Sequence, residues 1–333
     1  MIETIYIERQ VLEHARTQAV LARFPRADRV YIDRYGEVFN RKSQNFRLQK
    51  RRPALILAAK QDGYVLPTPP GYGIGGANNY YFSHLLNCLY DCRYCFLQGM
   101  FSSAHYVLFV NLESFEQRID ALLAQHADEP VYFFSGYDCD SLALESVTHF
   151  VNDILPFFRS RPRAWLELRT KSVQTRPLLD VEPFDNCVVA FSLTPAAFAA
   201  ALDHKAPSVK RRLDVIRRLS EHGWNIGLRF DPLIHGVGWQ DQYSELFDQV
   251  FDVVAPERVH SVSYGPLRFP KAMFKDIVRL YPEEPLFAGP TSDATGMVAY
   301  PAEIESAMGD FCRSRLGEVL SDSVFFQCTP EAV

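Results

Sequence analysis

The chain has 333 residues, 47% of them apolar, and its 35 basic and 40 acidic side chains leave a net charge of −5. This composition excludes an intrinsically disordered chain, and the sign of the charge excludes a global attraction for polyanions such as DNA. The first residues lack the apolar run of a secretory signal, and no later window holds 18 uncharged apolar residues, so we expect a cytoplasmic protein without a membrane partner. The seven cysteines of so large a chain are expected to be reduced thiols.

Residues 1–79 are predicted to form a small N-terminal subdomain. Two strand-like stretches, RVYIDRYGEVF and PALILAAK, lie on either side of a basic run, and a hinge rich in proline and glycine follows them. The basic run could bind DNA phosphates and stack a base, or it could simply be a solvated face. Its charged residues are Arg41, Lys42, Arg47, Lys50, Arg51 and Arg52.

Residues 80–269 alternate between short, apolar, β-branched or aromatic stretches and longer stretches whose apolar residues recur every three or four positions. This alternation predicts six strand and helix units and therefore a parallel α/β sheet. Because the count stops at six, we expect a partial (β/α)6 TIM-like barrel rather than a closed one. The predicted strands are 80–87, 131–136, 164–171, 187–194, 225–234 and 258–267. A C-terminal appendage of helices and one strand is predicted for residues 270–333.

Three cysteines, Cys88, Cys92 and Cys95, follow the first predicted strand of the barrel. Three thiolates on one loop can hold three irons of a cubane cluster and leave the fourth iron open to a substrate. A structural zinc site is the alternative, and it would need a fourth ligand such as His84 or Cys139. In that case the chain would be a zinc-stabilised nucleic-acid-binding protein. The position of the loop at the C-terminal end of a barrel strand favours the catalytic cluster.

The spacing CxxxCxxC, with Tyr94 before the last cysteine, resembles the signature of the radical S-adenosyl-L-methionine (SAM) enzymes. The stretches CLYDCRYCFLQ, HYVLFVN, TKS, AFSLT and HGWNIGLRFDPLIHGVGWQDQYSELF are similar to those of the spore photoproduct lyase family. This resemblance implies a radical SAM partial barrel with a 4Fe-4S cluster and SAM as cofactors. It also implies cleavage of SAM to a 5'-deoxyadenosyl radical, abstraction of hydrogen from a thymine photoproduct in DNA, and an electron donor such as flavodoxin or ferredoxin.

The resemblance also implies roles for single residues. Cys88, Cys92 and Cys95 match the cluster ligands of the family. Lys171 and Ser192 match residues near SAM, and Ser135 with Gly136 falls on the turn whose backbone binds the SAM amino group. Tyr94, Tyr137 and Cys139 are the residues for which catalytic roles are expected. Arg229 and Asp231 share one face of a strand, either as a polar barrel interior or in a structural ion pair.

The chain departs from the family pattern at three places. Tyr137 stands where the hydrogen-donating cysteine of the family is expected, and Cys139, two residues later, is the remaining candidate donor. Phe96 replaces a tyrosine linked to the return of the radical to SAM. The loop 287–300 lacks the basic and aromatic residues with which the family opens the duplex. The same radical chemistry on another substrate, such as a modified nucleotide or a peptide, is therefore the alternative function.

Overall fold

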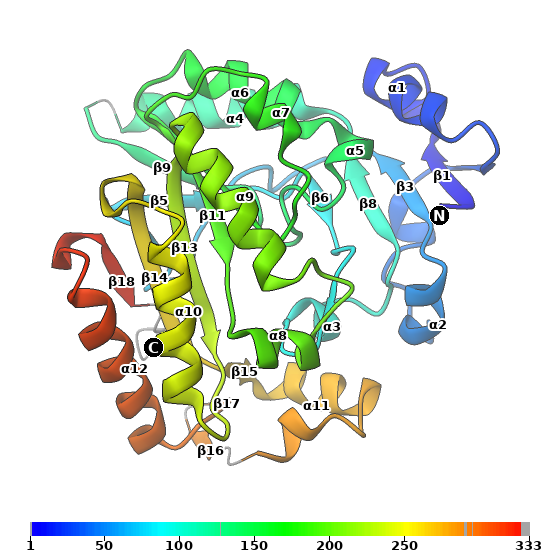
Figure 1. The fold of residues 1–333 in the computed structure, drawn as a ribbon. Coiled ribbons are helices and arrows are strands. Elements are labelled where there is room, and N and C mark those ends of the chain that lie inside the picture. The colour runs from blue at the N-terminus through cyan, green and yellow to red at the C-terminus, as the bar shows by residue number, and fades with distance from the viewer. Residues whose placement is uncertain (1, 127, 290–291, 295, 328–333) are drawn as a thin grey trace.

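A strongly curled parallel sheet is the largest element of the computed structural model, which describes residues 2–126, 128–289, 292–294 and 296–327 (Figure 1). The order of its strands is β18-β14-β13-β11-β10-β9-β5-β4, and every neighbouring pair is parallel except β4 with β5. The predicted partial barrel of alternating strands and helices is thus confirmed. The strands are β4 (Leu66–Pro67), β5 (Asn78–Tyr81), β9 (Val131–Phe134), β10 (Ala164–Thr170), β11 (Cys187–Ser192), β13 (Asn225–Leu233), β14 (Val259–Pro266) and β18 (Phe325–Gln327).

The helices of the barrel cover the outer face of this sheet (Figure 1). Helix α9 ends at His222, because Gly223 takes a positive φ of 113° and its N–H closes the last turn. The helical stretch between β9 and β10 is divided into α5 and α6 by His149, which has a φ of 49°. The bounds are α4 (Leu112–Gln125), α5 (Glu145–Thr148), α6 (Phe150–Arg159), α7 (Arg176–Leu179), α8 (Ala196–Leu202), α9 (Val209–His222), α10 (Trp239–Phe251) and α12 (Ala302–Gly317).

A second sheet is built mainly from the N-terminal residues, in the order β2-β1-β3-β8-β6. Strand β8 comes from the segment after the cysteine loop, so this sheet joins residues from both sides of that loop. The division of the chain into units at residues 79 and 269 stays a prediction. The elements are β1 (Thr4–Glu8), α1 (Ala15–Arg23), β2 (Asp28–Ile32), α2 (Phe46–Arg51), β3 (Leu55–Ala58), β6 (Leu85–Leu86) and β8 (Tyr106–Phe109).

The prediction of one barrel strand over residues 80–87 is wrong in one respect. Its first half lies in β5, which ends at Tyr81, whereas its second half crosses to the other sheet as β6 and pairs with β8. The cysteine loop therefore does not follow the first barrel strand directly. It follows β6 and enters the barrel mouth from the N-terminal sheet.

Small elements close the mouth of the barrel. Strand β7 (Asp91–Cys92), within the cysteine loop, pairs with β12 (Asp203–His204), and helix α3 (Leu97–Met100) follows the loop and packs on α11 (Lys271–Leu280). A three-stranded sheet of β15 (Arg268–Pro270), β17 (Met297–Ala299) and β16 (Ser292–Ala294) contains part of the loop 287–300, of which residues 290, 291 and 295 lie outside the described residues.

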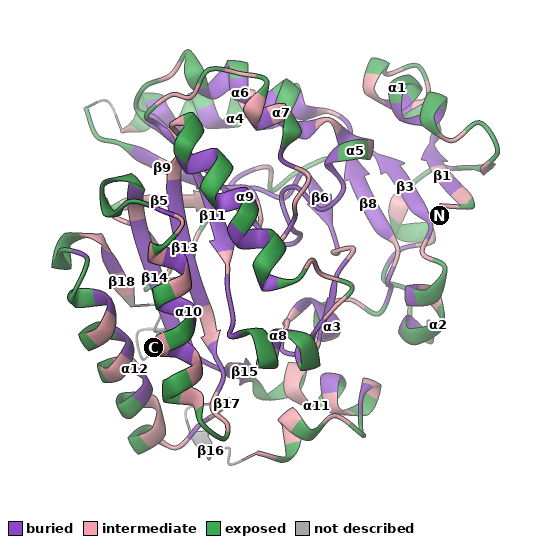
Figure 2. Cartoon of the chain, in the orientation of Figure 1, coloured by how far each residue is buried: buried purple, intermediate pink, exposed green. Residues whose placement is uncertain are grey.

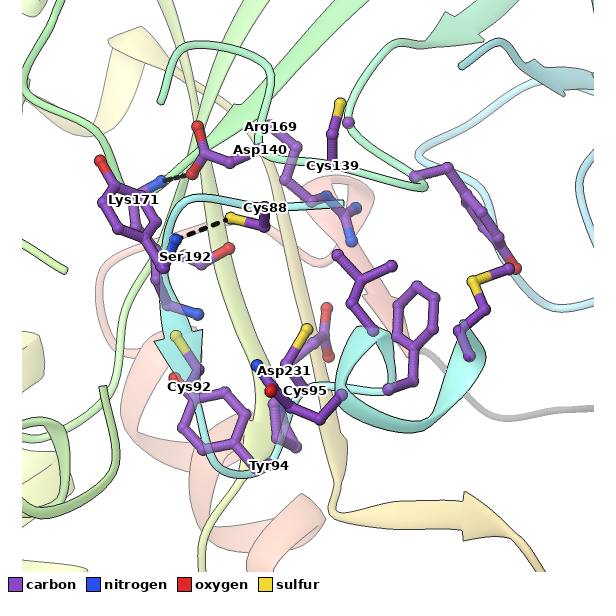
Figure 3. Close-up of a pocket in the computed structure, with 18 of the residues that line it drawn as sticks. Cys88, Cys92, Tyr94, Cys95, Cys139, Asp140, Arg169, Lys171, Ser192 and Asp231 are labelled. Atoms are coloured by element: carbon purple, nitrogen blue, oxygen red, sulfur yellow. Dashed lines mark hydrogen bonds between the residues drawn. The ribbon is translucent and has the colours of Figure 1, made fainter. Parts of the chain in front are cut away.

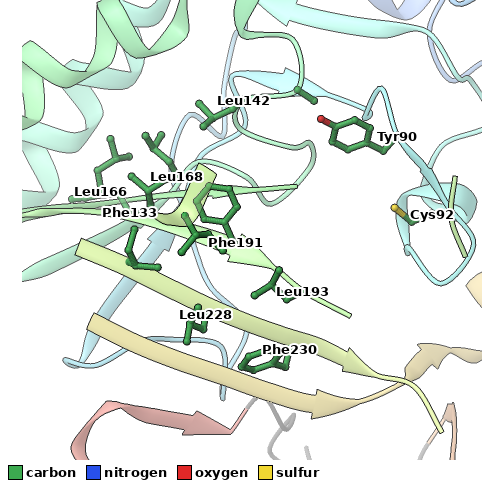
Figure 4. Close-up of a cluster of buried hydrophobic side chains, with 14 of the residues drawn as sticks. Tyr90, Cys92, Phe133, Leu142, Leu166, Leu168, Phe191, Leu193, Leu228 and Phe230 are labelled. Atoms are coloured by element: carbon green, nitrogen blue, oxygen red, sulfur yellow. The ribbon is translucent and has the colours of Figure 1, made fainter. Parts of the chain in front are cut away.

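The core fills the space between the barrel sheet and its helices, where Figure 2 shows continuous burial along the strands. Phe133, Leu166, Phe191 and Leu228 are at most 1% exposed and lie on adjacent strands (Figure 4). Cys92 belongs to the same cluster, so the cysteine loop packs directly on the barrel core. None of the helices in the described part of the chain combines the length and the apolar composition that crossing a membrane requires.

Candidate active site

A cavity of about 480 Å³ opens at the C-terminal ends of the barrel strands (Figure 3). This is the end of a parallel α/β barrel at which loops can converge on a ligand. Ten residues were predicted to bind the cluster, to bind SAM or to act in catalysis, and nine of them line the cavity. They are Cys88, Cys92, Tyr94, Cys95, Gly136, Tyr137, Cys139, Lys171 and Ser192.

The cysteine loop is held at both ends by hydrogen bonds. Asn87 takes a positive φ of 68°, which asparagine tolerates better than most residues, and its side-chain amide donates to the carbonyls of Ser103 (2.8 Å) and His105 (2.7 Å). At the other end, the N–H of Cys95 donates to the carbonyl of Cys92 (3.2 Å). The loop is therefore an ordered turn that presents its thiols to the cavity.

Cys92 is buried and Cys88 and Cys95 are half-buried, and desolvation is the largest influence on the ionisation of all three thiols. It raises the pKa of Cys88 to about 12, and it also raises the pKa values of Cys92 and Cys95 above that of an ordinary thiol. Bound iron would reverse this balance, because a metal cation stabilises the thiolate form of its ligands. The donor set is thus suited to soft metal ions rather than to nucleophilic catalysis by a free thiolate.

The residues that the structure describes contain no group of three His, Cys, Asp or Glu side chains that converges on a single metal position. A cubane cluster takes one thiolate per iron, so its ligands must face one cavity rather than one point. The three cysteines meet that requirement, because all of them line the cavity.

Lys171 follows β10 and lies within a buried charge network. Its Nζ is 3.8 Å from Asp203 and 4.8 Å from the centre of the Tyr94 ring. Burial alone would lower the pKa of Lys171, but the Asp203 carboxylate favours the cation, and the pKa lies well above its usual value. The predicted cation is therefore in the cavity, and it has a carboxylate partner that sequence analysis did not identify.

Asp203 is the centre of this network. It accepts a hydrogen bond from the hydroxyl of Tyr94 and another from Arg212 (2.6 Å), and its backbone pairs with that of Cys92 across β7 and β12. Burial alone would raise the pKa of Asp203, but Lys171 and Arg212 outweigh it and lower the pKa. Arg212 also donates to the carbonyl of Ser192 (3.1 Å). One aspartate thus ties the cysteine loop to the ends of β10 and β11.

Arg212 could have been found in the sequence. It is completely buried, and it lies on the face of α9 that carries Val209, Leu213 and Ile216. A charged residue within an apolar stripe of helical spacing must have a buried partner. No comparable signal identifies Asp203, because it lies in a two-residue strand before the helix.

The turn after β9 presents Gly136 to the cavity, whereas Ser135 points away from it. Ser135 is completely buried, and its hydroxyl bonds with Ser141 (2.8 Å) and the carbonyl of Glu167 (3.0 Å). A Cβ on Gly136 would lie 2.8 Å from the carbonyl oxygen of Arg169 and 2.8 Å from the hydroxyl of Ser141. Glycine is therefore required for this turn to lie against β10.

Asp140 anchors the next part of the same loop. Its carboxylate accepts hydrogen bonds from the hydroxyl of Thr170 (2.7 Å) and the backbone N–H of Lys171 (2.6 Å), and the second of these is drawn in Figure 3. The loop after β9 is thus fixed to the end of β10. Nothing in the sequence pattern indicated this anchoring role of Asp140.

Tyr137 and Cys139 lie on the same loop but differ in their surroundings. The ring of Tyr137 stacks on Tyr81 with 4.2 Å between centroids, and Phe96 lies 6.0 Å away. In Figure 3 the sulfur of Cys139 points away from Cys88 and Cys92; it lies 3.6 Å from the carbonyl oxygen of Ser135. Cys139 also packs in the apolar cluster beneath the N-terminal sheet. Of the two, only Tyr137 forms part of an aromatic wall of the cavity.

Arg229 and Asp231, which share a strand face, have separate roles in the structure. Arg229 is fully buried, and its guanidinium lies 2.7 Å from Glu167. Burial alone would raise the pKa of Glu167, but Arg229 and Arg169 lower it to about 2. Arg229 therefore belongs to a structural ion pair. Asp231 lines the cavity and accepts a hydrogen bond from the hydroxyl of Ser263.

The basic run does not form one uniform surface. Arg41, Lys42, Arg47, Arg51 and Arg52 are exposed, and two of them have carboxylate neighbours: Arg47 lies 3.3 Å from Glu283, and Arg52 lies 3.7 Å from Glu3. Lys50 is buried, and its ammonium points inward to the cysteine loop. The expectation that Lys50 binds DNA phosphate is therefore wrong, because its ammonium is already engaged by backbone carbonyls.

Comparisons with known proteins agree with this geometry. A family model described as spore photoproduct lyase matches residues 77–289. The chain is 23% identical over 203 residues to the spore photoproduct lyase of Bacillus subtilis (strain 168), and 23% identical over 202 residues to that of Geobacillus sp. (strain Y412MC61). Each alignment covers 60% of this chain and 59% of the relative, so the chain matches less than two thirds of each relative's length.

Solved structures show the same fold. A variant of spore photoproduct lyase with bound AdoMet and dinucleoside spore photoproduct superposes with a TM-score of 0.86 over 99% of both chains at 17% identity. A complex of spore photoproduct lyase with dinucleoside spore photoproduct gives a TM-score of 0.82 over 99% of this chain and 98% of the other, again at 17% identity. The family model covers most of the barrel and includes the cysteine loop. This chain belongs to the spore photoproduct lyase family.

Proposed function

We propose that this chain is a radical SAM lyase that holds a 4Fe-4S cluster on Cys88, Cys92 and Cys95 and acts on a thymine photoproduct in DNA. The observation that carries the proposal is the convergence of the three thiols with Lys171, Ser192 and Gly136 on one cavity at the barrel mouth. Family membership supports the same assignment. When bound, the cluster and SAM would supply a 5'-deoxyadenosyl radical, and the chain's own residues would bind and orient the cofactors and the substrate.

The residues around the cavity suit the polar groups of SAM. The Lys171 ammonium has three donors, and its pairing with Asp203 leaves others for a carboxylate in the cavity. The hydroxyl of Ser192 and the backbone beside Gly136 supply neutral polar partners. Asp203 and Arg212 hold this cation in place, so the charge that would meet SAM is fixed before SAM binds.

The opposite wall suits a nucleobase. Phe96, Tyr137 and Met273 line the cavity there with aromatic and thioether groups, which pack against the face of a base without requiring a fixed hydrogen-bond pattern. The solved relatives are described with a dinucleoside spore photoproduct, which supports a DNA-like substrate. The exposed arginines and lysine of the basic run are available to duplex phosphates.

The proposed reaction requires a reducing environment and an electron donor. The six cysteines that the structure describes are free thiols, as expected in the reducing cytoplasm. Reductive cleavage of SAM needs one electron, for which a small protein such as flavodoxin or ferredoxin is the expected donor.

Anaerobic reconstitution with iron and sulfide tests the proposal. The expected product is a brown protein with about four irons that forms 5'-deoxyadenosine from SAM under reductant. Addition of dinucleoside spore photoproduct is expected to yield the repaired dinucleoside. A colourless protein that binds one zinc would overturn the proposal in favour of a zinc-stabilised nucleic-acid-binding protein.

A second candidate is the same radical chemistry on another substrate, such as a modified nucleotide or a peptide. The observation that favours it is the pair of changes at Tyr137 and Phe96, together with the thiol of Cys139, which lies against the Ser135 carbonyl and points away from the cluster cysteines. Formation of 5'-deoxyadenosine without repair of the dinucleoside would select this candidate. Candidate substrates can then be ranked by how strongly each accelerates SAM cleavage.

A further inference from the structure

Lys50 differs from the rest of the basic run in which it occurs. Its side chain points into the molecule and is only 7% exposed, whereas its neighbour Arg51 is exposed. The Lys50 ammonium donates to the carbonyl of Cys88 (2.7 Å) and to the carbonyl of Tyr90 (2.9 Å). It also lines the cavity that the three cysteines share. A residue of the N-terminal region thus reaches the centre of the site.

Helix α2 holds Lys50 in this position. Asn45 caps the helix by accepting from the N–H of Leu48 (3.0 Å), and Phe46 and Lys50, four positions apart, share the buried face. The carbonyl of Lys50 accepts a hydrogen bond from the ammonium of Lys205 (3.1 Å), which lies next to β12. The backbone of the helix is therefore held at both ends, and Lys50 extends toward the cysteine loop from a fixed position.

A buried ammonium is costly unless its donors are satisfied and a negative charge lies near. Two carbonyls of the cysteine loop satisfy two of its three donors. These carbonyls belong to a predicted cluster ligand and to a residue between two such ligands. Cluster thiolates would provide the negative charge, which explains why a lysine rather than an apolar residue lies at this point.

We propose that Lys50 is a positioning residue that fixes the cysteine loop and places a positive charge beside the cluster, an inference that rests on the proposed function. A cation near the cluster favours the reduced, more negative state and therefore raises the reduction potential. Its hydrogen bonds to the loop also slow the release of iron, because groups that orient metal ligands generally strengthen metal binding.

The test compares three variants with the wild-type chain after anaerobic reconstitution. Lys50→Met removes the charge with little change in volume, Lys50→Arg keeps the charge, and Arg51→Gln removes a neighbouring exposed charge as a matched control. The midpoint potential is measured by EPR-monitored titration, and iron release is measured with a chelator. We expect Lys50→Met to lower the potential and to speed iron release about 10-fold. Arg51→Gln should change neither, and Lys50→Arg should keep the potential near that of the wild type.

A measurement on the iron-free chain separates this inference from the proposed function. Hydrogen–deuterium exchange of peptides covering residues 88–92 should be faster in Lys50→Met than in Arg51→Gln, whether or not the cluster can be assembled. A wild-type potential and unchanged exchange in Lys50→Met would overturn the inference and leave the proposed function intact. Absence of iron from the wild-type chain would instead overturn the proposed function.

Discussion

The two sides of the cavity are built in different ways. The proposed cofactor side contains Cys92, Tyr94 and Lys171, which Asp203 and Arg212 join in a buried network of opposite charges and hydrogen bonds. The proposed substrate side contains the uncharged aromatic and thioether side chains of Phe96, Met100, Tyr137 and Met273. Charge networks tolerate few substitutions, because removal of one partner leaves a buried charge unpaired. Aromatic and thioether surfaces can be repacked at small cost.

This difference agrees with where the sequence departs from its family. The departures that the resemblance implies at Phe96 and Tyr137 lie on the proposed substrate side, whereas the cysteine loop and Lys171 match the pattern that the resemblance implies. The cofactor side is therefore the part of the site where substitutions should be most damaging. Variants on the cofactor side should impair formation of the radical, whereas variants on the substrate side should alter the reaction of the radical with the substrate.

The largest effect is expected for Cys92→Ala. It removes one of the three predicted iron ligands from the loop that packs on the barrel core, so the cluster should not assemble. Iron content after reconstitution should fall sharply, and 5'-deoxyadenosine formation should reach background. Cys187→Ala is the control, because Cys187 is an equally buried thiol on β11 that does not line the cavity. Full iron content in Cys92→Ala would contradict the assignment of the ligands.

The second effect concerns the charge network. Asp203→Asn leaves Lys171 and Arg212 as buried like charges, and loss of one partner from such a group costs about 3–5 kcal/mol. The free energy of unfolding of the iron-free chain in urea measures this cost. Asp214→Asn is the control, because Asp214 forms an exposed pair with Lys210 (3.6 Å) that is worth at most about 0.5 kcal/mol. Equal losses in the two variants would show that Asp203 is not the centre of a network.

Much of the fold could be predicted from the sequence, because the elements of the barrel have strong periodic patterns. The strand predicted over 164–171 is close to the observed β10, and α9 carries both an apolar stripe and a glycine cap. The cysteine loop was identified by the spacing of its thiols. These signals depend on residues that are near one another in the chain.

Contacts between distant segments could not be predicted in this way. The stretch 80–87 divides between two sheets because Leu85 pairs with Leu108, a partner that no local pattern reveals. Lys50 resembles its exposed neighbours in sequence, and only the position of the Cys88 carbonyl distinguishes it. Asp203 gives no signal of its own. Sequence alone thus identified residues that line the cavity, but not those that hold them in place.

A third, smaller effect is expected for Gly136→Ala. The added Cβ would lie 2.8 Å from the Arg169 carbonyl oxygen, so the turn after β9 must move away from β10. A shift of this kind at a binding turn should weaken SAM binding about 100-fold, measured by equilibrium dialysis with the reconstituted protein. In the control Gly317→Ala, the added Cβ meets nothing within 4 Å, and SAM affinity should not change. Normal SAM affinity in Gly136→Ala would separate this turn from cofactor binding.

The smallest effect on SAM cleavage is expected on the substrate side. Tyr137→Phe keeps the ring that stacks on Tyr81 but removes the hydroxyl, so formation of 5'-deoxyadenosine should stay within about twofold of the wild type. The products formed from the dinucleoside should nevertheless change, because this hydroxyl belongs to a ring that lines the cavity. Cys139→Ala is the matched variant on the same loop, and its products should be those of the wild type, since its thiol lies against the Ser135 carbonyl. The opposite result, altered products in Cys139→Ala alone, would require this thiol to turn into the cavity during the reaction and would assign hydrogen return to the cysteine.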